Sequence, residues 1–140
     1  MLRDVGAIVA GLAVAFGAIM AIQMIGHAIW PPPDDIDWND VEAARTYISQ
    51  LPFLALLFPI ASYFVGAVAG PFVAGKIGTA RPAIFAGVIG LVLLAATIAN
   101  LIQIPHPYWF SGLALAAVLV GAWLGLQLGD DSGQKPAEDD

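Results

Sequence analysis

Residues 82–129 read PAIFAGVIGLVLLAATIANLIQIPHPYWFSGLALAAVLVGAWLGLQLG and contain no Asp, Glu, Lys or Arg. A bilayer core about 30 Å thick is crossed by roughly 20 apolar residues in a helix, so this stretch is long enough for two spans. The break between them lies at QIPHP, residues 103–107, because each proline lacks an N–H donor and disfavours helical backbone in the residue before it. The stretch predicts two membrane-spanning helices joined by a tight turn.

The composition extends this conclusion to the whole chain. Of 140 residues, 59% are hydrophobic and 11% are charged, which is outside the range of ordinary soluble domains. The formal charge of −6 is concentrated after Trp30 and after Gly129, so the chain has no basic face, and nucleic acid is excluded as a partner. Cysteine is absent, which excludes disulfides and thiolate chemistry.

Two further apolar segments precede this stretch. The first, at about 5–30, is longer than the roughly 7–15-residue apolar region of a secretory signal and is expected to be retained as a helix. The second, at about 51–74, places Pro52 in a first helical turn. With spans at about 82–104 and 107–128, residues 1–129 are predicted to form an all-α integral membrane protein, a four-helix transmembrane bundle. Residues 130–140 are expected to be a disordered, acidic cytoplasmic tail.

Residues 31–50 form the polar segment between the first two spans. Asn39 and Glu42 have the spacing of a capping box, in which Asn39 would cap a short helix over about 40–50. Apolar residues recur at helical spacing along it, so we expect an external amphipathic loop helix that lies on the membrane interface. These residues are Val41, Ala44, Ile48 and Leu51, with Trp38 and Tyr47 alongside.

Basic residues near the span ends predict the orientation. Arg3, Lys76, Arg81 and Lys135 fall on one side of a four-span chain, and Arg45 falls on the other. Because cytoplasmic loops carry the excess of Lys and Arg, both termini are expected in the cytoplasm and the acidic segment outside. In a bacterium this would be a multi-pass protein of the inner (plasma) membrane.

Small residues four apart indicate where helices approach closely, since backbone contact replaces the hydrophobic effect in lipid. Every predicted span carries such a seam, so we expect a compact bundle in the lipid bilayer with surplus seams for a second copy or another membrane protein. The seams are Ala7-Gly11-Ala15, Ala13-Gly17-Ala21, Gly66-Gly70-Ala74, Ala86-Gly90 and Ala117-Gly121-Gly125-Gly129.

Polar side chains within the spans are the candidate functional residues, because such groups are costly in lipid and usually face the bundle interior or a cavity. We expect them to face inward, and at least His27 and Asn100 to bond another helix directly or through a water and so to fix the register of the bundle. They gather in the outer half of the predicted bundle: Gln23, His27, Asn100, Gln103, His106 and, near the midplane, Tyr63.

The two histidines allow a metal or haem site as well as plain interhelical hydrogen bonding. A structural zinc site normally takes four protein ligands, and haem would need both imidazoles to face each other across a cavity. We therefore favour hydrogen bonding and predict no metal and no cofactor. The acidic segment resembles the opening of a calcium loop, but Asp40 replaces the required Gly and Thr46 the required Glu.

Pro59 lies about two turns inside the second predicted span. It cannot donate to the carbonyl of Ala55, and lipid cannot satisfy that oxygen, so we expect a helix kink at Pro59. Ser62 is close enough in sequence to bond part of the freed backbone.

Four segments occur together in this chain: HAIWPPP (27–33), LP (51–52), the Gly66/Gly70/Gly75 seam and NLIQIPHPYWF (100–110). In this combination the chain resembles, over nearly its whole length, a group of small uncharacterised bacterial four-span proteins. The resemblance implies a bacterial inner-membrane location and no particular activity. The small multidrug exporters share the size and span count, but their transport depends on a carboxylate within the first helix, which the predicted span 5–30 lacks.

The hypothesis we favour is a structural or accessory membrane protein that packs through its Gly/Ala seams. The alternative is a dimeric conduit for small solutes or ions, lined by Gln23, His27, Asn100 and Tyr63, although its cytoplasmic half would lack a polar lining. An intramembrane enzyme ranks third, because neither His27 nor His106 has a nucleophile within sequence reach.

The predicted orientation can be tested in this cysteine-free chain. Single cysteines at Asn39 and Gly78 should react with a membrane-impermeant thiol reagent from opposite sides, Asn39 from outside, because an odd number of predicted spans separates them. Reaction of both from the same side would contradict the four-span topology.

Overall fold

The computed structural model describes residues 1–130, and its regular secondary structure over that range is entirely helical. The helices are α1 (Leu2–Ile29), α2 (Val41–Gln50), α3 (Phe53–Ile77), α4 (Pro82–Gln103) and α5 (Tyr108–Gly129). Of these, α1, α3, α4 and α5 are long and apolar enough to cross a membrane, so the chain is a four-span membrane protein. The expected disordered tail lies outside the described residues, except for Asp130.

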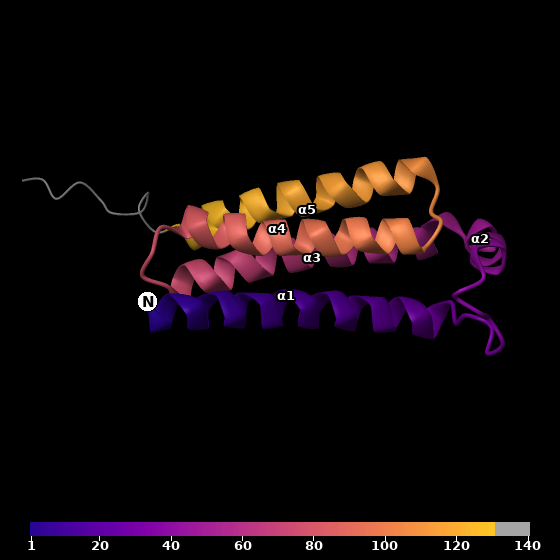
Figure 1. The fold of residues 1–140 in the computed structure, drawn as a ribbon, viewed down its shortest axis with the longest axis horizontal. Coiled ribbons are helices and arrows are strands. Elements are labelled where there is room, and N and C mark those ends of the chain that lie inside the picture. Colours follow the sequence, from indigo (N-terminus) through magenta and orange to yellow (C-terminus); the bar gives the residue numbers. More distant parts are fainter. Residues whose placement is uncertain (131–140) are drawn as a thin grey trace, which may run out of the picture.

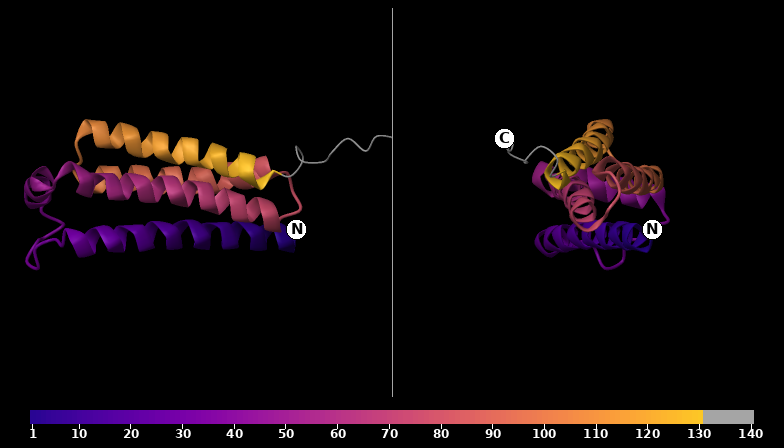
Figure 2. Two further views of the ribbon diagram at one scale, coloured as in Figure 1. Left: turned by 180° about the vertical axis from the view of Figure 1, so that it is seen from behind. Right: turned by 90° about the vertical axis from the view of Figure 1, so that its left-hand side faces the viewer.

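The four long helices lie side by side, and α2 lies across one end of the bundle (Figure 1). We call the end with α2 the outer end, and the end with Met1 and the α3–α4 turn the inner end. In the end-on view of Figure 2, α3 lies between α1 and α5, with α4 beside it. α3 contacts each of the other three long helices, whereas α1 packs mainly on α3. The bundle is therefore organised around α3.

The close packing of α1 on α3 depends on glycine. A methyl group added at Gly11 would lie 2.7 Å from the carbonyl oxygen of Gly70. One added at Gly66 would lie 2.8 Å from the carbonyl oxygen of Ala15. Two of the predicted seams therefore face each other, and the backbones of the two helices approach closely at these glycines.

The contact between α3 and α5 is of the same kind. A methyl group at Gly121 would lie 2.8 Å from the carbonyl oxygen of Phe64, and one at Gly125 would lie 2.5 Å from that of Val68. Pro71, which the sequence analysis did not single out, is fully buried at this contact, and its Cβ is 3.1 Å from the same added methyl at Gly125. Backbone contacts on two sides of α3 thus close the inner half of the bundle.

The boundaries of α3 differ from those predicted. Pro52 is the N-cap residue and not part of the first turn, and the helix continues past residue 74 to Ile77 with both Pro59 and Pro71 inside it. Burial of Pro71 against α5 keeps the chain helical there, because a neighbouring helix can compensate an interior proline. The kink at Pro59 stays a prediction.

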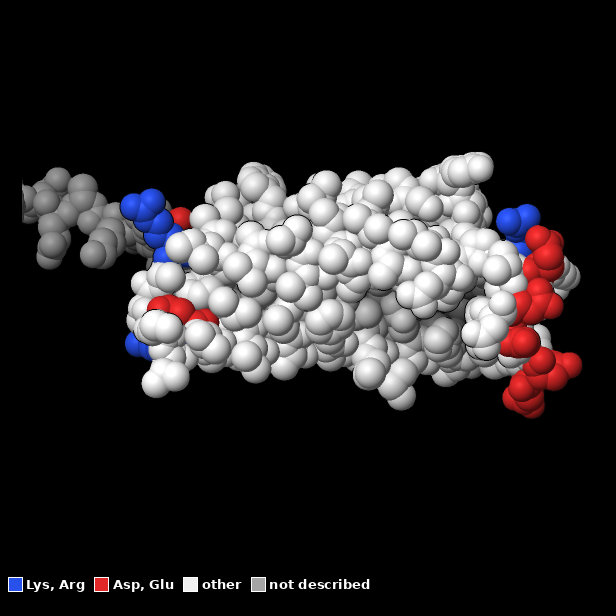
Figure 3. Space-filling model, in the orientation of Figure 1, with Lys and Arg blue, Asp and Glu red and all other residues white. Residues whose placement is uncertain are grey.

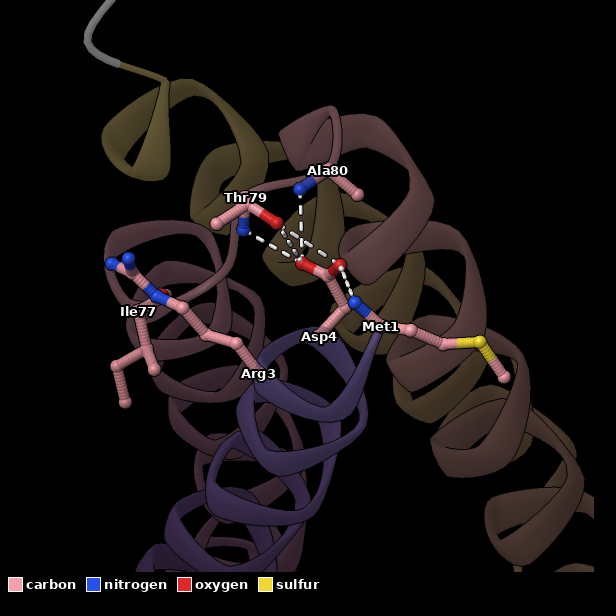
Figure 4. Close-up of polar contacts among 6 residues, drawn as sticks. All are labelled: Met1, Arg3, Asp4, Ile77, Thr79 and Ala80. Atoms are coloured by element: carbon pink, nitrogen blue, oxygen red, sulfur yellow. Dashed lines mark hydrogen bonds and ion pairs between the residues drawn. The ribbon is translucent and has the colours of Figure 1, made fainter.

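At the inner end, the start of α1 is fastened to the turn between α3 and α4 (Figure 4). Asp4 accepts hydrogen bonds at Oδ1 from the backbone N–H groups of Thr79 and Ala80, at 2.7 and 3.0 Å. The Thr79 hydroxyl also lies 2.9 Å from Oδ1. Arg3 donates from Nε to the carbonyl oxygen of Ile77, at 2.6 Å, near the end of α3. We call these contacts the inner clasp, and the sequence analysis did not predict them.

The crowded α3–α4 turn affects the topology test. A side chain at Gly78 would overlap the ring of Phe85, which is fully buried. The exposed Arg81 is therefore a better position than Gly78 for the inner-side cysteine.

At the outer end, the residue that caps α2 is Asp40 and not Asn39, so the predicted capping box is wrong. Asp40 Oδ1 accepts from the backbone N–H groups of Glu42 and Ala43, at 3.0 and 3.2 Å. Asn39 instead donates its backbone and side-chain N–H groups to Asp37, at 2.9 and 3.2 Å. Asp37 holds Asn39 in this local turn, which leaves the cap to the next residue, whose negative charge suits a helix N-terminus.

The apolar face of α2 packs on the bundle. Ala44 and Ile48 are buried, and Tyr47 and Leu51 pack against the hydrophobic core. The bundle end therefore covers part of the predicted face, whereas Val41 remains exposed. The location of α2 on the membrane interface stays a prediction. The acidic residues around α2 gather at the outer end (Figure 3).

The backbone contacts predict a contrast between two glycines of α5. Gly125→Ala should destabilise the protein by about 1–3 kcal/mol, the usual cost of overpacking a tight core. Gly112→Ala should be neutral or stabilising by up to about 1 kcal/mol, because alanine favours helix and a methyl there meets nothing within 4 Å. Thermal unfolding in detergent measures both, and equal effects would contradict the packing described above.

Candidate functional site

A cavity with a volume of about 360 Å³ lies at the outer end of the bundle. It is bounded by α1, α2, α3, the end of α4 and the segments joining them. The surface is hollowed between α1 and α4 near the acidic end of the molecule (Figure 3). The sequence predicted polar groups at this depth but not a cavity.

The cavity wall is mostly aromatic and aliphatic, with a few polar groups. The lining residues are Gln23, Gly26, His27, Trp30, Pro32, Trp38, Tyr47, Ile48, Leu51, Ala55, Leu56, Phe58, Pro59, Tyr63, Asn100, Ile104 and His106. Five of the six predicted site residues are among them, and Gln103 is not. Gln103 is exposed at the end of α4, so the structure does not bring it into the site.

Two side-chain hydrogen bonds between helices form the floor of the cavity. Asn100 on α4 donates from Nδ2 to the hydroxyl oxygen of Tyr63 on α3, at 2.9 Å. Gln23 on α1 donates from Nε2 to the hydroxyl of Ser62 on α3, at 3.2 Å. The Ser62 hydroxyl in turn donates to the carbonyl oxygen of Pro59, at 2.7 Å. These bonds join α1, α3 and α4 at one depth, so the polar groups fix the register of the outer half.

Ser62 bonds a different carbonyl from the one that the sequence indicated. Its hydroxyl donates to the oxygen of Pro59 itself and not to that of Ala55, which is the one that loses its donor. The spacing of three residues favours this bond, since a serine in a helix reaches the carbonyl three or four positions back.

The two histidines both line the cavity, but they differ in exposure and in hydrogen bonding. His27 is exposed and makes no hydrogen bond within the described part of the chain. His106 lies in the α4–α5 turn, with Nδ1 2.8 Å from the carbonyl oxygen of Ile104 and its ring stacked on Phe110 at 4.3 Å. Because a carbonyl only accepts, Nδ1 carries the proton. Burial lowers the pKa of His106, so the ring is neutral at pH 7 and Nε2 is an acceptor.

Two aromatic pairs form the outer part of the wall. Trp30 and Phe58 meet edge to face at 5.5 Å, and Trp38 meets Tyr47 in the same way at 5.7 Å. The Tyr47 hydroxyl lies 3.5 Å from the carbonyl oxygen of Trp30, which ties the two pairs together. The sequence assigned Trp38 and Tyr47 to the membrane interface. The pairing of Trp30 with Phe58 had no sequence signal, because it depends on how α1 packs on α3.

The arrangement offers hydrogen bonding and apolar contact. Within residues 1–130 no three His, Cys, Asp or Glu side chains lie close enough together to hold a metal ion. The Ser62 hydroxyl, at the level of the floor, is engaged by Gln23 and by the carbonyl of Pro59. The site can therefore offer hydrogen bonds and apolar contact to a bound molecule.

Comparisons of the chain with known protein families, curated protein sequences and solved structures gave no match. The functional argument therefore rests on the geometry of this structure.

The floor predicts a small effect of one substitution. Asn100→Leu should remove the bond to Tyr63 and lower the free energy of unfolding in detergent by about 0.6 kcal/mol, the typical value for an interhelical hydrogen bond in a membrane. Insertion of the spans should be unaffected. The exposed Gln103, changed to Leu, is the matched control on the same helix. A loss of several kcal/mol, or equal effects of both changes, would contradict the role given to Asn100.

Proposed function

We propose that this membrane protein is a structural or accessory protein that conducts no solute and packs against a second copy of itself or another integral membrane protein. Its proposed location is a bacterial inner membrane, with both termini in the cytoplasm and α2 outside. The observation that carries the proposal is the backbone contact of α3 with α1 and α5, which leaves no polar path through the inner half.

The position of the polar residues supports this proposal over a dimeric conduit. Gln23, Tyr63 and Asn100 line a cavity inside one copy of the chain. Gln23 on α1 and Asn100 on α4 each donate a hydrogen bond to a hydroxyl of α3. Groups turned into an internal cavity are not available to line a pore between two copies. The cavity is bounded below by the hydrogen-bonded floor, and the glycine contacts lie beyond it.

The surface that would carry association is the outward face of α1. The seam of Ala13, Gly17 and Ala21 is exposed, and a methyl group at Gly17 would meet nothing within 4 Å. The other seam of α1, Ala7-Gly11-Ala15, packs against α3. Small residues left facing lipid permit close approach of another helix, which is the usual basis of helix association in membranes.

A photo-crosslinking amino acid at position 17 tests the association. In membranes of the producing cells it should give a discrete protein adduct, either a second copy or one other membrane protein. The same amino acid at Gly112, which also faces open space on the lipid side, is the control and should give lipid adducts. Lipid adducts alone at both positions would contradict the accessory role.

The absence of conduction needs its own measurement. Liposomes containing the purified chain should show the same ion and small-solute flux as empty liposomes. A flux that depends on the protein and is lost in Asn100→Leu would favour the conduit instead.

A further inference from the structure

The floor of the outer cavity has hydrogen-bonding atoms that the protein leaves unused. Gln23 and Asn100 each donate through their amide nitrogen, and their amide oxygens accept no hydrogen bond in the described residues. Every fully buried side-chain polar atom there has a partner, so these oxygens are not fully buried. Tyr63 accepts from Asn100 and also lies beside the Gln23 side chain, so its hydroxyl proton can be donated to Gln23 or to a bound molecule. The floor therefore offers two acceptors and one donor at the same depth.

The wall of the cavity selects against charge. Among the described residues that line it there is no Asp, Glu, Lys or Arg. Of its two histidines, His106 is neutral and His27 is exposed at the surface. Burying an ionised group without a partner is far more costly than burying a hydrogen-bonded neutral one. The carboxylates of the outer end, such as Asp34 and Asp35, are exposed and do not line the cavity. A ligand that reaches the floor should therefore be uncharged.

The shape and position of the cavity indicate how a ligand would reach it. Its volume is within the usual range for small-molecule sites, roughly 300–1,000 Å³. Its lower part lies between α1 and α4, which contact each other little and between which the surface is hollowed (Figure 3). These are membrane-spanning helices, so the hollow between them faces lipid. A molecule dissolved in the outer half of the bilayer can reach the floor from the side.

We propose that the outer cavity binds one neutral amphiphile of the membrane, with a hydroxyl group on the floor and a hydrocarbon body against the aromatic wall. A hydroxyl is both a donor and an acceptor, so it can donate to Gln23 or Asn100 and accept from Tyr63. A ketone or ester would leave the amide oxygens unpaired. This site is separate from the α1 seam proposed for helix association and stands or falls independently of it.

Quenching of tryptophan fluorescence by brominated amphiphiles tests the proposal. In the full chain carrying Trp109→Phe and Trp123→Phe, the fluorescence reports from Trp30 and Trp38, both in the cavity wall. The probes are a brominated long-chain alcohol, its methyl ether, the matching carboxylate and the matching trimethylammonium compound, each titrated in detergent micelles. The alcohol should quench with saturation, and the other three should bind at least about tenfold more weakly.

Two pairs of variants locate the binding. Tyr63→Phe should weaken binding of the alcohol about fivefold to tenfold, the cost of about one hydrogen bond, while Tyr108→Phe, at a position 97% exposed, should not. Ala55→Phe should fill the cavity and abolish saturable quenching. Ala61→Phe, on an exposed position of α3 outside the cavity, should leave it intact. Because Ala55→Phe adds apolar contacts without removing a polar bond, it tests the site even if Tyr63→Phe disturbs the floor.

Each other result has a definite meaning. Quenching that rises without saturation for all four probes and is unchanged in Ala55→Phe would show a cavity without a ligand and overturn the proposal. Tightest binding of the trimethylammonium compound would also overturn it, and would assign the aromatic wall to a cation instead. If hexanol competes as well as a long-chain alcohol, the hydroxyl site is supported, and the molecule that it binds is a small alcohol and not a lipid.

Discussion

The structure depends on direct backbone contact between α3 and its two neighbours. In a bilayer, burying an apolar side chain between helices gains little over leaving it in lipid, so helices associate through van der Waals packing at short range. Glycine allows that range because it has no side chain. Gly11 and Gly66 bring α1 against α3, and Gly121 and Gly125 bring α5 against its other side. α4 follows, packing Phe85, Ile89 and Leu93 into the remaining groove.

The same contacts explain why the two halves of the bundle differ. Near the outer end, large or rigid residues such as Trp30, Phe58 and Pro59 line a space between the helices. Polar groups line this space, and α2 covers it with its apolar face packed against the bundle. At the inner end the clasp of Asp4 on Thr79 and Ala80 holds the short turn against α1. The inner end is thus closed by backbone contacts and by the inner clasp. The outer end is open enough to hold a small molecule.

Much of the fold could be predicted from the sequence because its signals are strong and local. Charge-free stretches of the right length specify the spans, and glycines four apart specify the contact faces; Gly66 and Gly70 do lie against α1. The depths of Gln23 and Asn100 also follow from counting residues. Tyr63 was expected nearer the midplane, and its bond to Asn100 was therefore not predictable in this way. The choice of cap was not, since Asn39 and Asp40 are nearly equal candidates and the bond from Asn39 to Asp37 decides between them.

The cavity and the inner clasp could not be predicted, because both join residues far apart in the chain. Asp4 and Thr79 are brought together only by the packing of α1 on α3, and no pattern in either segment announces the bond. Phe58 meets Trp30 only because the outer end of α1 packs on α3, where Gly26 lies against Phe58. The exposure of Gln103 has the same origin: its depth was foreseeable, but the direction it faces depends on how α4 is rotated against its neighbours.

The central claim is that water and small solutes reach the floor of the outer cavity and no further. Single cysteines at Ala55, Ala67 and Ala74 of α3 sample the cavity and two levels of the closed half, where both alanines are fully buried. With a small water-soluble thiol reagent present on both sides of the membrane, the cysteine at 55 should react and those at 67 and 74 should not. Reaction at 67 at a rate comparable to that at 55 would show that the glycine contacts do not close the bundle, and would contradict the account.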